Sequence, residues 1–264
     1  MDEVEGARTF AASGSAYDLY MGRYSIPLAD VFADAAGVER GQTALDVGCG
    51  PGALTRVLAE RLGADAVAAC DPSPPFVEEC RARLRGVDVR LGRAEHIPFD
   101  DDRFDAALAQ LVLHFVSDPS AAAAEMARTV RPGGMVGACV WDFAKGMEML
   151  RHFWDAASTL NPDAPDEART LRFGAPGEIV ALFEGAGLLS VEETSLTVQS
   201  SYDDFDEMWS GFLAGIGPAG AFTVSLADDQ RERLRQDLYR RIGEPDGPFS
   251  LSATARCAIG RVRD

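Results

Sequence analysis

Between residues 41 and 143, short apolar runs alternate with segments whose apolar residues recur every three or four positions. Runs of the first kind predict buried strands, and segments of the second kind predict amphipathic helices. We expect strands at 43–47, 66–70, 87–91, 104–109 and 135–141, and helices at 52–62, 74–84 and 120–130. The turn Pro132-Gly133-Gly134 should end the last of these helices. Five strands alternating with helices predict a doubly wound parallel sheet, because parallel neighbours need crossover connections.

After Phe143 the alternation is less regular and longer helical segments appear. We expect helices at 147–160, 176–186, 202–214 and 227–242, and strands at 188–198 and 249–262. Gly187 suits the C-terminal end of the second of these helices. The stretch from about 201 to 247 is too helical for a plain hairpin turn, so we interpret it as a cap over the ligand end of the sheet.

The first expected strand runs directly into Asp46-Val47-Gly48-Cys49-Gly50-Pro51-Gly52. Glycines let a backbone turn sharply and approach a ligand closely, and the following helix directs its N-terminal amides at the same place. Nicotinamide enzymes use a related G-x-G-x-x-G pattern at this position. Here the pattern is G-x-G-x-G, and an aspartate stands two residues before the first glycine.

This run resembles motif I of the class I S-adenosylmethionine-dependent methyltransferases. Further segments, in the order and spacing of that family, extend the resemblance over residues 40–142. The segment Ile97-Pro98-Phe99, continued by Phe104-Asp105, resembles the small-molecule branch related to the ubiquinone and menaquinone biosynthesis methyltransferases. The resemblance implies an α/β, doubly wound (Rossmann-like), mostly parallel seven-stranded sheet with an antiparallel last strand and helical cap insertions. We expect one domain overall, with an N-terminal helical segment (1–40), a cofactor-binding core (41–143) and a C-terminal part (144–264).

The second strand ends at Asp71, where a carboxylate can accept hydrogen bonds from both ribose hydroxyls. A helix cap or a surface charge is the alternative for this residue. The resemblance implies roles for other segments: Ala94 and Glu95 beside the adenine, and Gln110 and Leu111 at the methionine end. An arginine pairs well with a carboxylate, so Arg23 is our candidate for the methionine carboxylate, and Tyr17 closes over the same end. A surface position remains the alternative for both. The expected cofactor-binding set is Tyr17, Arg23, Asp46, Gly48, Cys49, Gly50, Asp71, Pro72, Ser73, Ala94, Glu95, Gln110 and Leu111.

Methyl transfer is an in-line displacement that requires alignment of the acceptor and sometimes removal of a proton. His114, just after the fourth strand, has the ordinary pKa of a general base, and a structural or acceptor-lining role is its alternative. Trp141 and Asp142 follow the fifth strand and should face the acceptor, while His96 and His152 are weaker candidates. Aromatic residues of the cap should be core residues, and some should line an apolar acceptor cavity: Phe153, Trp154, Phe173, Phe205, Met208, Trp209, Phe212 and Phe222.

The chain has 25 basic and 42 acidic residues, for a net charge of −17. Such a charge repels phosphate backbones and anionic membranes, so we expect neither nucleic acid nor a membrane as a partner. No apolar run approaches the ~20 residues of a membrane span, and no signal-peptide core is present. The five cysteines and three histidines fit no metal-site spacing. We therefore expect a cytoplasmic protein without a metal, a monomer or homodimer, acting on a small organic molecule through an undetermined O, N or C atom.

Two other functions share features with this sequence. A nicotinamide oxidoreductase requires a glycine at position 53, which is Ala53, and a Tyr-x-x-x-Lys pair, which is absent from the sequence. A protein of the same fold could instead bind S-adenosylmethionine for a structural or regulatory purpose, or for another reaction. The cofactor motifs would survive in such a protein, so the sequence does not exclude it.

Overall fold

The computed structural model describes residues 21–264 and contains a seven-stranded sheet of order β3-β2-β1-β4-β5-β7-β6. Strands β1 to β5 pair in parallel, whereas β7 lies antiparallel between β5 and β6. This topology confirms the expected doubly wound sheet with an antiparallel last strand. The strands are β1 (Ala44–Val47), β2 (Val67–Asp71), β3 (Asp88–Leu91), β4 (Phe104–Gln110), β5 (Val130–Trp141), β6 (Leu189–Tyr202) and β7 (Phe249–Arg261).

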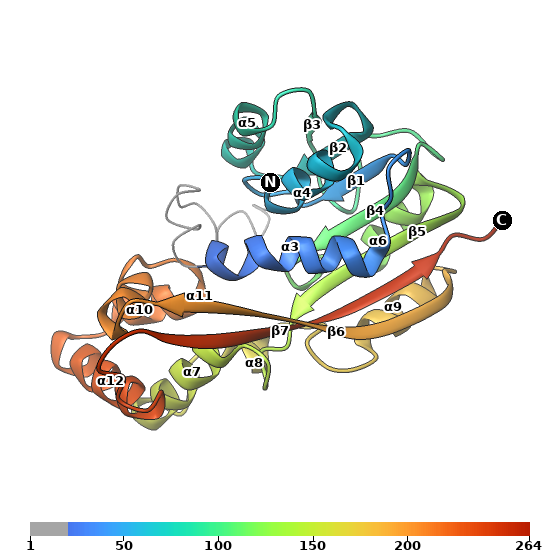
Figure 1. Cartoon of the computed structure of the whole chain (residues 1–264). Coiled ribbons are helices and arrows are strands. Elements are labelled where there is room, and N and C mark those ends of the chain that lie inside the picture. Colours follow the sequence, from blue (N-terminus) through green and yellow to red (C-terminus); the bar gives the residue numbers. More distant parts are fainter. Residues whose placement is uncertain (1–20) are drawn as a thin grey trace.

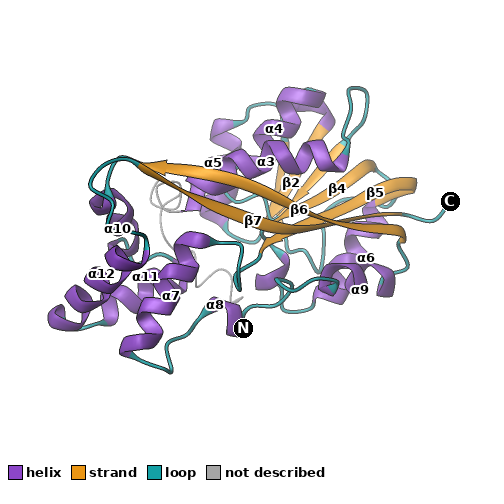
Figure 2. Ribbon diagram, turned by 60° about the horizontal axis from the view of Figure 1, so that its bottom comes forward, coloured by secondary structure: helices purple, strands orange, loops and turns teal. Residues whose placement is uncertain are grey.

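Helices cover both faces of the sheet (Figures 1 and 2). One face carries α3 (Arg23–Ala36), α4 (Ala53–Leu62) and α5 (Pro74–Arg83), and the other carries α6 (Pro119–Thr129) and α9 (Glu178–Gly185). The remaining helices gather beside one end of the β6–β7 hairpin: α7 (Glu148–Leu160), α8 (Glu167–Thr170), α10 (Phe205–Leu213), α11 (Gly217–Ser225) and α12 (Asp228–Arg241). Two short 3₁₀ helices complete the described chain, η2 (Ala64–Ala66) and η3 (Leu113–Phe115).

The central strands are apolar on both faces because helices bury both faces. All four residues of β1 and all five of β2 are buried. Neighbouring residues of β1 enter different cores: Ala44 packs with the α3 and α4 side, and Leu45 packs with the α6 and α9 side. This explains why the sequence shows continuous apolar runs there and not a strict alternation.

Several elements differ from the sequence-based expectation. Strand β5 begins at Val130, so the Pro132-Gly133-Gly134 segment lies inside the strand and not in a preceding turn. A Cβ at Gly134 would lie 2.7 Å from the Asp105 carbonyl oxygen, so glycine permits close strand approach there. Strand β6 continues to Tyr202, and the helices α8 and α11 were not predicted.

The helices beside the β6–β7 hairpin bury their aromatic residues largely against one another. The rings of Phe153 on α7 and Phe212 on α10 are stacked 4.4 Å apart, and Trp154 contacts Phe222 of α11. The predicted core role of these residues is therefore correct. No helix within residues 21–264 is long and apolar enough to cross a membrane.

Candidate cofactor site

The loop after β1 is held in a conformation that requires glycine at its first position. Gly48 has φ +75°, and the N–H groups of Gly48 and Cys49 both donate to the Cys70 carbonyl oxygen at 2.8 and 3.0 Å. A Cβ on Gly48 would lie 2.5 Å from a methyl carbon of Val112. The loop is thus fixed against β2 on one side and packed on the segment after β4 on the other.

Helix α4 begins directly after this loop, and no side chain caps its N-terminus. The first N–H groups of such a helix have no intrahelical partner and carry the positive end of the helix dipole. The loop and the helix together therefore offer backbone donors to a polar or anionic ligand.

Asp71 ends β2 beside the same loop. One carboxylate oxygen accepts the Gly50 N–H at 2.9 Å, and the other accepts the Ser73 N–H at 2.8 Å. Burial raises the pKa of Asp71, while these two backbone hydrogen bonds oppose the rise. Each carboxylate oxygen can accept a further hydrogen bond, so Asp71 can still hold two hydroxyl groups of a ligand.

Asp46 stands one strand away, only 1% exposed, and accepts a 2.6 Å hydrogen bond from the Thr55 hydroxyl. Burial raises the pKa of Asp46 to about 7, and the nearby Asp71 carboxylate contributes to the rise. The hydrogen bond joins the end of β1 to the first turn of α4.

Gln110 and Leu111, at the end of β4, lie on the remaining side of the same site. The Gln110 Nε2 donates to the Ser25 carbonyl oxygen of α3 at 2.9 Å, whereas its buried Oε1 has no hydrogen-bond partner among residues 21–264. Leu111 has φ +61° and donates its N–H to Cys139 on β5. A leucine rarely adopts this backbone conformation, and such strain is concentrated at functional sites.

These elements surround one pocket at the carboxyl ends of the parallel strands. It lies where the strand order reverses between β1 and β4, which is the usual ligand site of doubly wound sheets. Eleven residues of the expected cofactor set line it: Asp46, Gly48, Cys49, Gly50, Asp71, Pro72, Ser73, Ala94, Glu95, Gln110 and Leu111. The sequence did not point to the other lining residues: Ser25, Pro51, Ala53, Leu54, Phe76, Arg93, Val112, Phe115 and Val116.

Some of the missed residues had a usable signal. Phe76 is an apolar residue in the first turn of α5, shortly after Asp71-Pro72-Ser73, and it lines the same pocket. Val112 and Phe115 follow the β4 end directly. Ser25 lies on α3, far away in the sequence, and only the fold brings it to the pocket.

Glu95 is held from several sides. Its carboxylate accepts the Ser117 N–H at 3.1 Å, and Arg93 lies within 3.4 Å of it. These contacts fix the segment after β3 at the edge of the pocket, where Ala94 is buried beside it.

The structure does not bring Arg23 to the pocket. Its guanidinium pairs with Glu207 of α10, donates to the Ser201 carbonyl oxygen at 3.3 Å and lies 4.1 Å above the Tyr202 ring. The contacts of Arg23 thus belong to the packing of α3 on β6 and α10. Tyr17 lies outside the described residues.

His114 does not line the pocket either. It lies in η3, is 7% exposed, and its ring contacts Phe115 and Phe143 at centroid distances of 4.0 and 5.6 Å. Burial lowers the pKa of His114 to about 3, so the imidazole is neutral at physiological pH. It could accept a proton only with difficulty, which argues against the predicted role as a general base.

Trp141, the last residue of β5, and Asp142, which follows it, differ in their surroundings. Asp142 pairs with Arg256 of β7 at 3.0 Å and accepts the Lys145 N–H, so its carboxylate is already engaged. Trp141 is buried, and its ring lies edge-on to Tyr24 at 6.4 Å. The cap also differs from the expectation: within residues 21–264, the pocket lining includes no residue of α7, α8 or α10 to α12.

Comparison with known proteins agrees with this geometry. Residues 45–137 match the family model described as "Methyltransferase domain". An uncharacterized methyltransferase of Mycobacterium tuberculosis is 47% identical over 98 residues, which cover 37% of this chain and 39% of that protein. The malonyl-[acyl-carrier protein] O-methyltransferase of Salmonella typhimurium is 36% identical over 128 residues, covering 47% of this chain and 49% of that enzyme. The matched segments thus span less than half the length of both curated relatives.

Among solved structures, a phosphoethanolamine N-methyltransferase of Haemonchus contortus in complex with S-adenosylhomocysteine has the same fold. Its TM-score is 0.56 at 14% identity, and the alignment covers 90% of this chain and 53% of that one. The fold and pocket define a Rossmann-like protein with its pocket at the carboxyl edge of the sheet. Over residues 45–137 the chain is thus similar to methyltransferase domains, among them those of the two curated relatives.

Proposed function

We propose that the protein transfers a methyl group from S-adenosylmethionine to a small organic acceptor and releases S-adenosylhomocysteine. The observation that carries the proposal is that the Gly48–Gly50 loop lies against the Asp71 carboxylate. The Gly50 N–H donates a hydrogen bond to that carboxylate. Doubly wound folds use this combination of close backbone approach and an accepting carboxylate to hold the ribose of a nucleoside.

The residues around the pocket fit this cofactor. Asp71 would accept hydrogen bonds from the ribose hydroxyls, and Ala94 and Glu95 would lie beside the adenine. The unpartnered Gln110 Oε1 is a buried acceptor that the cofactor's ammonium group would satisfy. When bound, S-adenosylmethionine supplies an electrophilic methyl group on its sulfonium.

The protein's own contribution is then binding, orientation and exclusion of water. The Gly50 and Ser73 amides hold Asp71 in place, and the Ser25–Gln110 hydrogen bond holds α3 against the end of β4. Leu111, Val112 and Phe115 give the pocket an apolar side that keeps water from the reacting centre. His114 lies outside this lining and is neutral, so it supplies no charge to the pocket.

Calorimetry with S-adenosylmethionine and with NADH tests the cofactor. We expect S-adenosylmethionine to bind and NADH not to bind. Asp71→Asn should weaken S-adenosylmethionine binding by about 1–3 kcal/mol, while Asp100→Asn, an exposed carboxyl outside the pocket, should leave it unchanged. Binding of NADH alone would exclude the proposal.

Turnover must be measured separately, because a protein that used the cofactor only structurally would also pass the binding test. The protein is incubated with S-adenosylmethionine labelled in the methyl group and a panel of small acceptors. Transfer of label to an acceptor, together with release of S-adenosylhomocysteine, is the expected result. Tight binding without any transfer would favour the alternative of a binding protein that does not methylate.

A further inference from the structure

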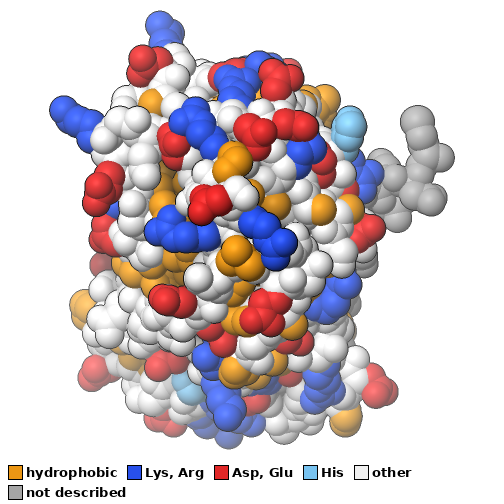
Figure 3. Space-filling model, turned by 90° about the vertical axis from the view of Figure 1, so that its right-hand side faces the viewer, with side chains coloured by type: hydrophobic (Ala, Val, Ile, Leu, Met, Phe, Trp, Pro, Cys, Tyr) orange, Lys and Arg blue, Asp and Glu red, His pale blue; other side chains and the backbone are white. Residues whose placement is uncertain are grey.

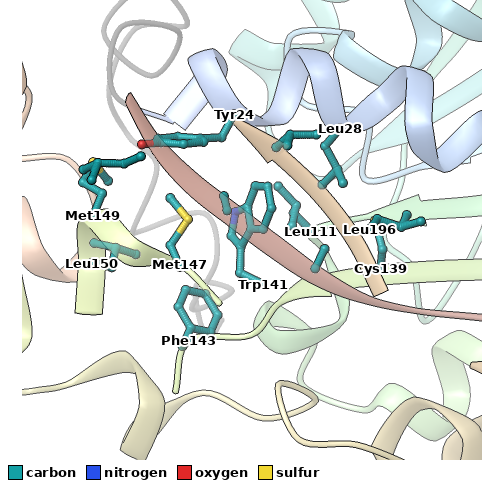
Figure 4. Packing of buried hydrophobic residues seen from close by; sticks show 14 of the residues in the cluster. Tyr24, Leu28, Leu111, Cys139, Trp141, Phe143, Met147, Met149, Leu150 and Leu196 are labelled. Carbon is teal, nitrogen blue, oxygen red and sulfur yellow. The ribbon is translucent and has the colours of Figure 1, made fainter. Parts of the chain in front are cut away.

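A second group of buried side chains begins where the cofactor pocket ends. We call Tyr24, Leu111, Trp141, Phe143 and Met147 the apolar wall (Figure 4). All five residues are at most 9% exposed. Leu111 lines the pocket and also packs in this cluster, so the wall adjoins the pocket at Leu111, while its other four residues lie behind the pocket lining.

One polar atom in the wall lacks a partner. The Trp141 Nε1 is buried and has no hydrogen-bond partner among residues 21–264. Figure 4 shows this nitrogen on the side of the indole that is nearer to Met147. An unsatisfied buried donor costs about 1–3 kcal/mol, and such a group in a native protein calls for an explanation.

The other polar atoms of the wall are already used or are uncharged. The Tyr24 hydroxyl is 2.9 Å from the Tyr202 hydroxyl, which in turn contacts the Met149 sulfur at 3.2 Å. His114, packed against Phe143, is neutral because burial lowers its pKa to about 3, although its buried Nδ1 also has no hydrogen-bond partner among residues 21–264. The Asp142 carboxylate beside the wall is neutralised by Arg256.

A charged molecule at this wall would therefore lose its hydration without gaining a counter-ion, which is strongly unfavourable. An apolar molecule would lose little, and an oxygen atom on it would satisfy the Trp141 N–H. Met147 and Met149 are unbranched and have several rotatable bonds, so they can move aside and adapt to a ligand's shape.

We propose that Trp141 determines acceptor specificity, with its indole N–H donating to an oxygen atom of an uncharged, largely apolar acceptor. This inference rests on the proposed methyltransferase function, whose cofactor site is separate from the wall's free donor. It names the acceptor's chemical class and leaves the methylated atom open.

Calorimetry on the full chain saturated with S-adenosylhomocysteine tests the inference with three matched probes. They are 4-propylphenol, 4-propylbenzoate and 4-propylbenzylamine, which differ in charge and share one apolar body. We expect 4-propylphenol to bind at least tenfold more tightly than either charged probe. Tighter binding of a charged probe, or no binding of any of the three, would overturn the proposal.

The variant Trp141→Phe removes the donor and keeps an aromatic ring. It should weaken 4-propylphenol binding about tenfold, leave S-adenosylhomocysteine affinity unchanged, and leave the melting temperature within a few degrees, because the N–H has no partner to lose. Trp209→Phe, which changes a tryptophan of α10 that stacks on Phe205 and is not one of the wall residues, is the matched control and should not alter probe binding.

The two proposals fail in different ways. Equal probe affinity for the unmodified protein and Trp141→Phe, with S-adenosylhomocysteine still bound, would refute the role of Trp141 alone. Failure of the unmodified protein to bind either S-adenosylmethionine or S-adenosylhomocysteine would refute the proposed function itself.

Discussion

Gly48 and Gly50 both have positive φ, yet only Gly48 is also confined by a neighbour. In Gly48→Ala the new Cβ would overlap Val112, so we expect a loss of about 2–4 kcal/mol of unfolding free energy from strain and overpacking. Gly50→Ala, with no atom within 4 Å of the new Cβ, should lose only about 1 kcal/mol. Denaturant unfolding of the protein without ligand measures both.

The double variant Gly48→Ala, Val112→Ala isolates the steric part of this effect. Shortening Val112 removes the methyl carbons that the new Cβ meets, so a part of the lost stability should return. If the double variant were as unstable as the sum of the two single variants, overlap with Val112 would not be the cause.

Asp46 gives a pH dependence whose sign follows from its burial. Its pKa in the folded protein is about 7, above that of an exposed aspartate, so folding favours the protonated form. The resulting stability is fully present at acid pH and is lost as the pH rises to about 7. Between pH 5.5 and pH 8 the unmodified protein should lose about 2 kcal/mol more than Asp46→Asn.

Urea unfolding at the two pH values checks this difference. Asp100→Asn, which changes an exposed carboxyl, is the control and should behave like the unmodified protein. An equal pH response in Asp46→Asn and the unmodified protein would show that Asp46 is not the group responsible.

For single residues, the sequence predicted those roles that depend on the conformation of the local backbone. The glycine loop and Asp71 could be found because turn chemistry and strand ends are local properties. Arg23 illustrates the opposite case, because its partners Glu207 and Tyr202 are about 180 positions away in the sequence. Only the tertiary structure reveals that its charge is already paired. His114 was placed correctly after the fourth strand, but its burial, which sets its pKa, was not visible in the sequence.

Among the elements, α3 is attached at its first turn to β6 and α10. Arg23 pairs with Glu207 and stacks on Tyr202, and the hydroxyls of Tyr24 and Tyr202 are 2.9 Å apart. We expect Arg23→Gln and Glu207→Gln to show a coupling of about 0.5–1 kcal/mol in a double-mutant cycle of unfolding free energy, the usual value for a pair partly open to water.

The same variants decide whether Arg23 also serves the cofactor. Since Glu207 already occupies the guanidinium, Arg23→Gln should change S-adenosylmethionine affinity by less than about threefold. Calorimetry on both variants gives the answer. A tenfold loss in Arg23→Gln that is absent from Glu207→Gln would restore the sequence-based assignment of Arg23 to the methionine carboxylate.

The elements that the sequence predicted well are those with a clear apolar period. Strands β1 to β4 and helices α4, α5 and α7 lie within one or two residues of the expected bounds. Helix α11 was missed because Gly217, Pro218 and Gly220 are typical of turns, and packing against α10 and α7 overrides that preference. The early start of β5 was missed because its Pro-Gly-Gly segment reads as a turn, although pairing with β7 continues there.

For the whole molecule, the net charge of −17 is distributed and not segregated on the face that Figure 3 shows. There, Lys and Arg side chains are interspersed with Asp and Glu. A nucleic acid needs several cations in a row to release its counter-ions, and this face does not provide them. The expectation of a small ligand therefore rests on both the charge and the pocket at the carboxyl ends of the strands.

The division between the pocket and the cap helices leads to a prediction about the whole chain. The pocket lining lies between residues 25 and 116, whereas α10 to α12 pack against α7 and β6. Saturation with S-adenosylmethionine at about 100 times Kd should raise stability by about 2.7 kcal/mol. Because direct contacts limit local opening, amide exchange should slow mainly at 46–54, 71–76 and 110–116. Helix α12 (Asp228–Arg241) should exchange at an unchanged rate under conditions where only local opening is sampled.

Hydrogen–deuterium exchange read by mass spectrometry distinguishes this from closure of the cap. NADH at the same concentration is the control and should slow exchange nowhere. Equal slowing in α10 to α12 and in the loop after β1 would mean that the cap helices fold down over the bound cofactor, as the sequence suggested. Slowing confined to the pocket would mean that they form a separate packing unit, whose influence on the reaction passes through α7 and the apolar wall and not through contact with the cofactor.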